Sequence, residues 1–161
     1  MEVSYLGNFE YQLKHKEVKV KILPAKTVIE SGAEPITISG PGEYEVKGVL
    51  VAGFKSADGQ TLYTYDLDEI RVAYLGTSKI KLTEKQLDWL DGVDLLLVST
   101  QAVELVKQIK PSLVVPIDDQ DKTKLDEFVK QLELEPKKEV KLALNKLDLP
   151  EETELVILTE K

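Results

Sequence analysis

The chain has 161 residues, of which 42% are hydrophobic and 31% are charged, so its composition is that of a globular protein rather than a disordered one. It contains no cysteine and one histidine, which excludes disulfides, thiolate catalysis and any metal site built on several imidazoles of a single chain. Because affinity for nucleic acid comes mainly from neutralising phosphates, the net charge of −8 leads us to expect no nucleic-acid partner.

The hydropathy of the chain indicates where the protein resides. No apolar run approaches the roughly 20 residues that a membrane-spanning helix needs. The opening MEVSYLGNFEYQ lacks the basic region and the long apolar core of a signal peptide. We therefore expect a cytoplasmic protein with no membrane partner, folded as a single domain over residues 1–161.

The first half of the chain has the alternating pattern of short β-strands with one buried face. The segment Pro24–Pro35 has the weakest pattern and predicts only a brief strand near Thr27–Ile29. Gly40-Pro41-Gly42 predicts a sharp turn, because glycine permits backbone angles that other residues avoid and proline fixes φ. A meander follows, in which Asp58-Gly59 is the strongest hairpin signal. The predicted strands are Glu2–Leu6, Phe9–Leu13, Val18–Ile22, Tyr44–Val46, Val49–Phe54, Thr61–Tyr65 and Ile70–Leu75.

From Leu82 onward the pattern changes to alternating helices and strands. Thr83 and Gln86 predict a capping box at the start of a helix that Gly92 ends. Two nearly all-apolar strands flank the next helix, so we expect a right-handed crossover and a parallel pair that is covered on both faces. The predicted elements are the helices Glu84–Leu90, Gln101–Ile109 and Lys122–Leu134 and the strands Val93–Val98, Leu113–Ile117, Val140–Leu144 and Leu155–Leu158.

Five blocks of the sequence, together with the opening VSYLGNFEYQL, resemble in order and spacing a branch of the metallo-β-lactamase-fold hydrolases. The blocks are ISGPGEYEVKGV, IRVAYLGT, LTEKQLDWLDGVDLLLV, ELVKQIKPSLVVPI and LDLPEETELVIL. The resemblance implies a fold of the α/β (α+β) class, a shortened αββα sandwich of two mixed β-sheets with outer helices. In the active family, a His-x-His-x-Asp-His loop, two further histidines and a bridging aspartate hold metal ions at one edge, and an activated water attacks the substrate.

The positions that the resemblance assigns to metal ligands do not carry the family's residues. Only Lys21–Thr37 fills the space of the His-x-His-x-Asp-His loop, without a histidine, so we infer that this loop and the helix after it are deleted. A family His-Leu-Gly-Asp reads Tyr74-Leu75-Gly76-Thr77, which places Thr77 at the bridging aspartate. A family Pro-Met-His reads Pro116-Ile117-Asp118, which places Asp118 at the last histidine. We therefore predict vestigial site positions at Tyr74, Thr77 and Asp118, with no catalytic residue, no metal and no cofactor.

The acidic residues Asp118, Asp119 and Asp121 are the best local alternative for a cation site. Magnesium and calcium prefer oxygen ligands, and the cluster follows a buried strand, where open α/β sheets commonly place their sites. The interpretation with fewer assumptions is that Asp119 or Asp121 caps the next helix.

Other features give weaker signals. His15 is interpreted as a solvated residue in a turn between early strands. Thr77-Ser78 suggests a hydroxyl nucleophile only if a base lies within hydrogen-bond reach, and the sequence promises none. Tyr44 and Tyr74 would line a pocket if they faced one, although tyrosine is ordinary in strands. Trp89 lies on a short capped helix and would mark a contact surface if it were exposed.

Three functions follow from these observations. The first is a non-catalytic pseudo-hydrolase that serves as a binding or assembly module, by self-association or with a protein partner, because the deleted loop clears one edge of the sandwich. The second is a metal-dependent hydrolase with a rebuilt centre of the three clustered carboxylates and Asp66 or Asp68, which predicts converging side chains with raised pKa values. The third is an enzyme to which a partner chain donates metal ligands.

Overall fold

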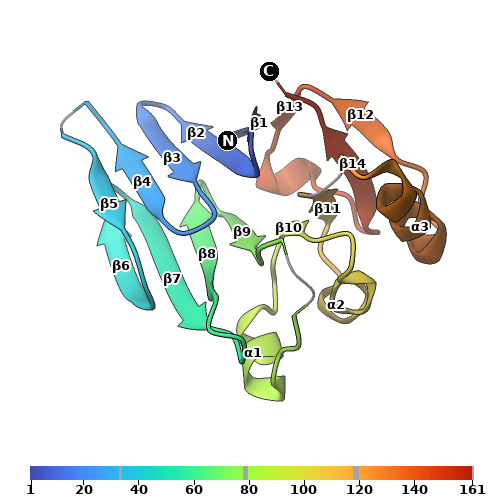
Figure 1. Cartoon of the computed structure of the whole chain (residues 1–161). Coiled ribbons are helices and arrows are strands. Elements are labelled where there is room, and N and C mark those ends of the chain that lie inside the picture. The colour runs from blue at the N-terminus through green and yellow to red at the C-terminus, as the bar shows by residue number, and fades with distance from the viewer. Residues whose placement is uncertain (33, 78–79, 118–119, 161) are drawn as a thin grey trace.

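The computed structural model describes residues 1–32, 34–77, 80–117 and 120–160, and two β-sheets packed face to face make up most of it (Figure 1). The six-stranded sheet contains, in spatial order, β13 (Lys141–Ala143), β1 (Glu2–Gly7), β2 (Glu10–His15), β3 (Val18–Ile22), β4 (Thr27–Glu30) and β5 (Ile36–Ile38). The eight-stranded sheet contains β12 (Lys137–Glu139), β14 (Glu154–Leu158), β11 (Leu113–Pro116), β10 (Leu95–Val98), β9 (Ile70–Tyr74), β8 (Thr61–Leu67), β7 (Val49–Lys55) and β6 (Gly42–Val46). The predicted two-sheet sandwich is therefore confirmed.

The six-stranded sheet is antiparallel throughout. Its alternating pattern sends Val3, Leu13 and Val20 into the interior, where each has an exposed fraction of 0%. The opposite face is polar, with an ion pair of 2.9 Å between Lys21 and Glu30, so this face can meet solvent without a helical cover. In the described part of the chain, Figure 1 shows α-helices on the outer side of the eight-stranded sheet only. The sandwich is thus shortened on its six-stranded side.

The eight-stranded sheet is mixed. Two mixed sheets were expected, and the antiparallel six-stranded sheet departs from that expectation. Strands β6 to β9 form an antiparallel meander, whereas β9, β10, β11, β14 and β12 pair in parallel. The central parallel strands β10 and β11 are apolar on both faces, because the other sheet covers one face and helices cover the other. These helices are α1 (Glu84–Trp89), α2 (Val103–Ile109) and α3 (Lys122–Leu132). The predicted capping box of α1 is present, since Gln86 N donates to the Thr83 hydroxyl at 3.2 Å and Thr83 N donates to Gln86 Oε1 at 3.0 Å.

The Gly40-Pro41-Gly42 turn carries the chain from one sheet to the other, from edge strand β5 to edge strand β6. Gly40 and Gly42 have φ angles of +92° and +139°, a region that residues with a Cβ atom disfavour. Gly40 N donates a hydrogen bond to the Tyr63 hydroxyl at 3.0 Å, which fixes the turn against β8. The abrupt break in the sequence pattern is therefore a corner of the sandwich.

The predicted strands and helices lie within two residues of the observed bounds, but the sequence pattern does not predict β5, β12 or the short 3₁₀ helix η1 (Lys146–Asp148). β5 has only three residues, and two of them are exposed. β12 reads Lys-Lys-Glu with all three residues exposed, and such a polar edge strand has no alternating apolar pattern. Among the described residues, none of the helices combines the length and the apolar character needed to cross a membrane.

Candidate functional site

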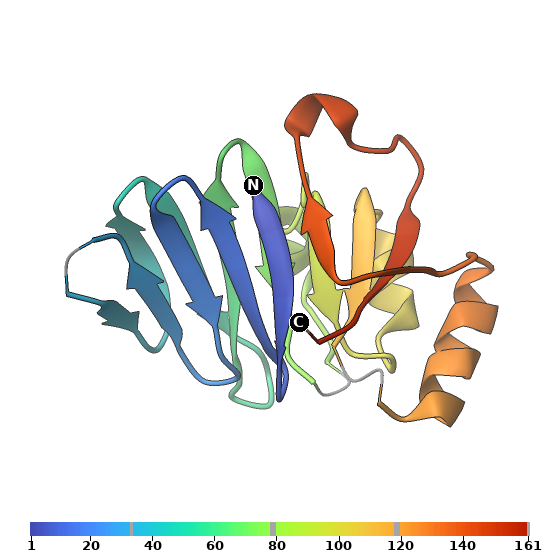
Figure 2. The same ribbon diagram turned by 90° about the horizontal axis from the view of Figure 1, so that it is seen from above.

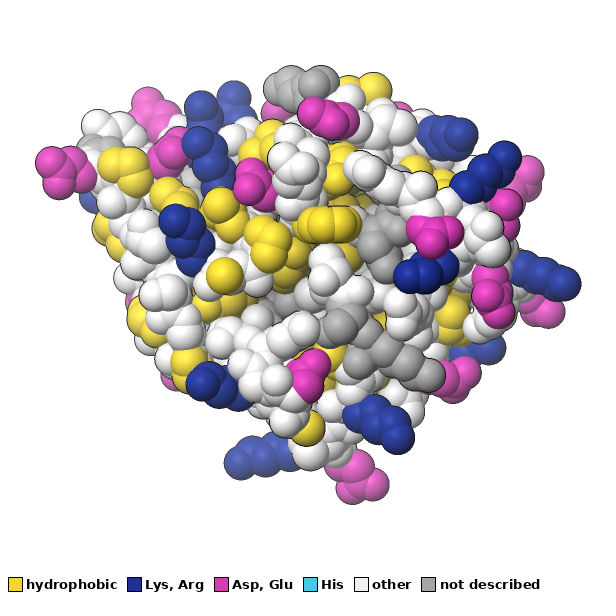
Figure 3. Space-filling model, in the orientation of Figure 1, with side chains coloured by type: hydrophobic (Ala, Val, Ile, Leu, Met, Phe, Trp, Pro, Cys, Tyr) yellow, Lys and Arg dark blue, Asp and Glu magenta, His cyan; other side chains and the backbone are white. Residues whose placement is uncertain are grey.

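One end of the sandwich holds Tyr74 and Thr77, the described positions that the resemblance links to chemistry. Strands β9, β10 and β11 are parallel, so their carboxyl ends meet there, followed by Leu75–Thr77 and Ile117. The β1–β2 turn at Asn8 and Phe9 lies at the same end, which is at the bottom of Figure 2. We call this end, with these segments, the site end. Figure 3 views it directly and shows hydrophobic side chains gathered near its middle, with charged side chains mostly around the margin.

Tyrosine rings fill the interior behind the site end. Tyr5 and Tyr11 face each other across the β1–β2 pair with ring centroids 5.0 Å apart. The ring of Tyr74, the last residue of β9, meets that of Tyr11 edge-on at 6.4 Å. All three side chains are buried, with an exposed fraction of 2% for Tyr74. The space between the two sheets at this end is therefore occupied by aromatic packing.

Two of these hydroxyl groups hold the turn above them. The Tyr74 hydroxyl donates to the carbonyl oxygen of Phe9 at 3.2 Å, and Phe9 N donates to the Tyr5 hydroxyl at 3.4 Å. Phe9 has a φ of +65°, which is unfavourable for a bulky residue, so these contacts hold a strained turn. Burial raises the pKa of Tyr74 far above its ordinary value of 10.0, and the negative charges that Tyr5 and Glu10 can carry add to the effect. Tyr74 is thus a neutral phenol at neutral pH, which is a poor metal ligand.

A second pair of tyrosines continues this packing along the sheet. Tyr63 and Tyr65 on β8 stack with ring centroids 6.1 Å apart. The Tyr65 hydroxyl shares a buried hydrogen bond of 2.6 Å with the Thr27 hydroxyl. Burial raises the pKa of both phenols, although the hydrogen bond between Thr27 and Tyr65 and the one from Gly40 N to Tyr63 act in the opposite direction. Five of the six tyrosines of the chain therefore lie in the buried interior.

The single histidine lies at the other end of the molecule. His15 is the last residue of β2 rather than a turn residue, and about 20 Å of strand separates it from Phe9 at a rise of about 3.3 Å per residue. Its Nδ1 lies 3.1 Å from Asp68 Oδ2, which also accepts from the terminal amine of Met1 at 3.0 Å. That hydrogen bond to the amine, followed by the charges of the amine, His15 and Lys16, lowers the pKa of Asp68. The interpretation of His15 as a solvated turn residue is therefore corrected: it is a half-buried strand end in contact with the Asp68 carboxylate.

The carboxylates suggested for a rebuilt centre do not converge among the described residues. Asp66 binds the Arg71 guanidinium through contacts of 2.8 and 3.3 Å, and Asp68 lies in the β8–β9 turn, far from the site end. Asp121 caps α3 by accepting from Lys124 N at 3.2 Å, as the simpler interpretation of the acidic cluster predicts. Asp118, Asp119 and Ser78 lie outside the described residues, so what was expected of them stays a prediction. Thr77 is half-buried just beyond β9.

The two remaining aromatic candidates lie elsewhere. Trp89 is half-buried and packs edge-on against Phe54, with ring centroids 4.2 Å apart. It borders a groove on the outer face of β6–β8 that Tyr44 and the half-exposed Leu50 also line. Tyr74 is buried in the interior and does not share that groove, so the two tyrosines suggested for one pocket are not brought together. The role of Trp89 as a contact surface stays a prediction.

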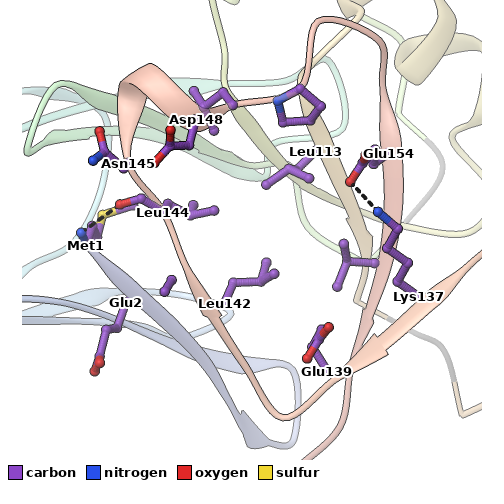
Figure 4. Close-up of a pocket in the computed structure, with 14 residues that line it drawn as sticks. Met1, Glu2, Leu113, Lys137, Glu139, Leu142, Leu144, Asn145, Asp148 and Glu154 are labelled. Atoms are coloured by element: carbon purple, nitrogen blue, oxygen red, sulfur yellow. Dashed lines mark hydrogen bonds and ion pairs between the residues drawn. The ribbon is translucent and has the colours of Figure 1, made fainter.

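A larger cavity of about 510 Å³ opens far from the site end, between β13 of the six-stranded sheet and β12, β14 and β11 of the eight-stranded sheet (Figure 4). Leucine side chains point into it, and charged residues stand around its mouth. The sequence pattern does not predict this cavity. Its lining comes from segments more than a hundred residues apart, such as Glu2 and Leu142, and no local pattern brings them together.

The described residues do not fit the zinc centre that the resemblance implies. Such a centre needs three or four ligands, usually imidazole, thiolate or carboxylate groups. In the ranges 1–32, 34–77, 80–117 and 120–160, no three His, Asp or Glu side chains lie close enough to hold a metal ion. The only imidazole of the chain is at the wrong end, and Tyr74 is committed to aromatic packing and to the Phe9 carbonyl.

Comparison with known proteins identifies the family. The model of the beta-lactamase superfamily domain matches residues 10–118, so the chain belongs to this superfamily. Among solved structures, one from Thermotoga maritima superimposes with a TM-score of 0.77 at 18% sequence identity and covers 99% of each chain. That protein is proposed to be a Zn-dependent hydrolase of the metallo-β-lactamase superfamily, and at this identity the likeness shows the shared fold. No curated protein matches the chain.

Proposed function

We propose that this superfamily member does not hydrolyse substrates through a metal of its own and serves instead as a binding or assembly module. The observation that carries the proposal is the packing of Tyr74. By the resemblance, this residue stands where the family has a histidine, yet its side chain is buried against Tyr11 and bonded to the Phe9 carbonyl. The residue that leads into the position of the bridging aspartate is thus held by aromatic packing and by a hydrogen bond to the backbone.

The residue at the position of the bridging aspartate also supports a chain without a metal centre. Thr77 stands at the place of the bridging aspartate, and a neutral hydroxyl cannot supply the negative charge that holds two cations close together. A sandwich that keeps its core without the family's histidine ligands has no need of a metal to hold its sheets together, and such a scaffold is suited to binding.

The hydrolase alternative receives less support. A rebuilt centre that uses Asp66 or Asp68 would have to bring them next to Asp121, but Asp66 pairs with Arg71 and Asp68 pairs with the terminal amine at the other end. We therefore favour self-association or a protein partner as the role that remains.

Two measurements test the proposal. Thermal unfolding is followed with excess Zn²⁺, with excess Mg²⁺ and with a chelator, while the mass in solution is measured over a range of protein concentrations. A native metal site would stabilise the protein by about 2.7 kcal/mol at a hundredfold excess over Kd, so we expect no such shift. A mass above the 18.1 kDa of the monomer would identify a self-assembling module, and a monomer would favour a protein partner. A zinc-dependent increase in Tm together with zinc-dependent hydrolysis would contradict the proposal.

A further inference from the structure

The cavity opposite the site end exists because the two sheets separate where the chain passes from one to the other. The segment between β13 and β14 carries η1 and bows away from both sheets, as the red loop at the top of Figure 2 shows. Lys146 of η1 anchors this loop through contacts of 2.8 and 2.9 Å with the Asp94 carboxylate. The loop is thus held open by a specific contact, and a cavity of about 510 Å³ remains beneath it. This volume lies within the range of about 300–1,000 Å³ typical of small-molecule sites.

The floor of the cavity is aliphatic. Leu113 from the eight-stranded sheet and Leu142 and Leu144 from the β13 side point into the space in Figure 4. Leu113 and Leu144 belong to the buried core, and Leu142 packs against it. A hydrocarbon chain placed here would therefore extend the core of the sandwich and would displace water from an apolar surface.

The charged groups at the mouth of the cavity differ in whether they have an ion-pair partner. The Lys137 ammonium group is paired with Glu154 at 3.0 Å. The terminal amine of Met1 is held by Asp68 at 3.0 Å and by the Leu144 carbonyl at 2.9 Å. The carboxylates of Glu139 and Asp148 stand on opposite sides of the cavity in Figure 4, and neither has an ion-pair partner among the described residues. The cationic groups at the mouth are thus already occupied, while two anionic groups are not.

We infer that this cavity is a binding site for an aliphatic amine in its ammonium form. The alkyl chain lies on the leucine floor, and the ammonium group lies at the mouth beside Glu139 or Asp148. A carboxylate ligand would have to take Lys137 from Glu154 and would leave that carboxylate without its cation. The charge at the mouth therefore selects for cationic ligands, whatever the role of the site end.

The test compares three probes with the same eight-carbon chain: n-octylamine, n-octanol and n-octanoate. Each is titrated into the full chain at neutral pH and low salt, with calorimetry for the affinity and methyl NMR for the location. We expect saturable binding of the amine, with shifts at the leucines of the floor, about tenfold weaker binding of the alcohol and still weaker binding of the carboxylate. Octanoate binding as tightly as octylamine, or no saturable binding of the amine, would overturn the inference.

Matched variants separate this site from the general attraction of an acidic protein for cations. The double variant Glu139→Gln, Asp148→Asn is expected to weaken octylamine binding about fivefold or more and to leave octanol unchanged. The control is Asp126→Asn, Glu127→Gln on the exposed surface of α3, which removes the same charge elsewhere and is expected to leave the affinity as it was. Equal losses in the two double variants would show that the amine senses only net charge and would refute the site. None of these readouts involves a metal, so the result is independent of the proposed function.

Discussion

The contact between Lys146 and Asp94 provides a quantitative test of how the cavity loop is held. The Asp94 side chain is 9% exposed, and its carboxylate accepts from Lys146 Nζ at 2.8 and 2.9 Å and from Arg71 N at 2.8 Å. Lys146→Met keeps most of the aliphatic stem and removes the ammonium group, which leaves a nearly buried carboxylate with the Arg71 amide as its remaining donor. Hydrogen bonds to charged groups contribute about 1.5–3 kcal/mol. Because Lys146 is itself 45% exposed, solvent screens the pair, and we expect a loss of about 1–2 kcal/mol.

The matched control is Lys137→Met, which removes the same group from an exposed pair. Lys137 and Glu154 are 60% and 41% exposed, so this variant is expected to cost about 0–0.5 kcal/mol. Urea unfolding at neutral pH gives the free energy of unfolding of each variant, and an unchanged m value shows that the unfolded states are comparable. Equal losses for the two variants, or a larger loss for Lys137→Met, would refute the argument that burial of the carboxylate determines the strength of the contact.

Three further predictions concern a turn, the buried phenols and one carboxylate. Glu69 has a φ of +64° in the β8–β9 turn, so Glu69→Gly is expected to raise the free energy of unfolding by about 0.5–1 kcal/mol. Glu69→Ala keeps the backbone strain and should leave the free energy of unfolding nearly unchanged. A lower free energy of unfolding in the glycine variant would contradict this prediction. Burial raises the pKa of Tyr63, Tyr65 and Tyr74, so tyrosinate absorbance near pH 11 should report fewer than six ionised tyrosines. The free energy of unfolding should also fall as the pH rises above about 10, because the tyrosines of the unfolded chain ionise there while the buried ones stay protonated. Tyr74→Phe should reduce the rise in tyrosinate absorbance only at the highest pH, where the buried tyrosines ionise. A smaller rise near pH 10 would show that Tyr74 is not shielded by burial. The pKa of Asp68 is lowered in the folded state, so the stabilising contribution of this carboxylate is present at neutral pH and is lost as the pH falls below 3.8, the ordinary pKa of the group. The difference in the free energy of unfolding between the wild type and Asp68→Asn should therefore narrow at low pH. A difference that stays constant would contradict the ion pair with the terminal amine.

Much of the fold could be predicted from local chemistry. The capping box at Thr83 and Gln86 sets the start of α1, and the all-apolar run Leu95–Val98 indicates a strand covered on both faces. The glycines of Gly40-Pro41-Gly42 mark a break, although the pattern does not reveal that the chain changes sheets there. These features depend on a few neighbouring residues, and for that reason a sequence read alone can find them.

The remainder depends on contacts between distant segments. The edge strand β12 has no apolar residue to reveal it, because its partner β14 supplies the buried side chains. Likewise, Tyr5, Tyr11 and Tyr74 look like ordinary strand residues until the two sheets are placed face to face. The sequence could show that family ligands are missing at the site end, but it could not show what fills their place.

The most direct test of the proposal that the chain holds no metal centre of its own is the metal content of the purified protein. The protein is equilibrated with Zn²⁺, freed of unbound metal by gel filtration and analysed for bound metal per chain. We expect much less than one zinc ion per chain, because the only imidazole pairs with Asp68 at the opposite end and Tyr74 is buried as a neutral phenol. One or two zinc ions retained per chain, with hydrolytic turnover that a chelator abolishes, would contradict the account.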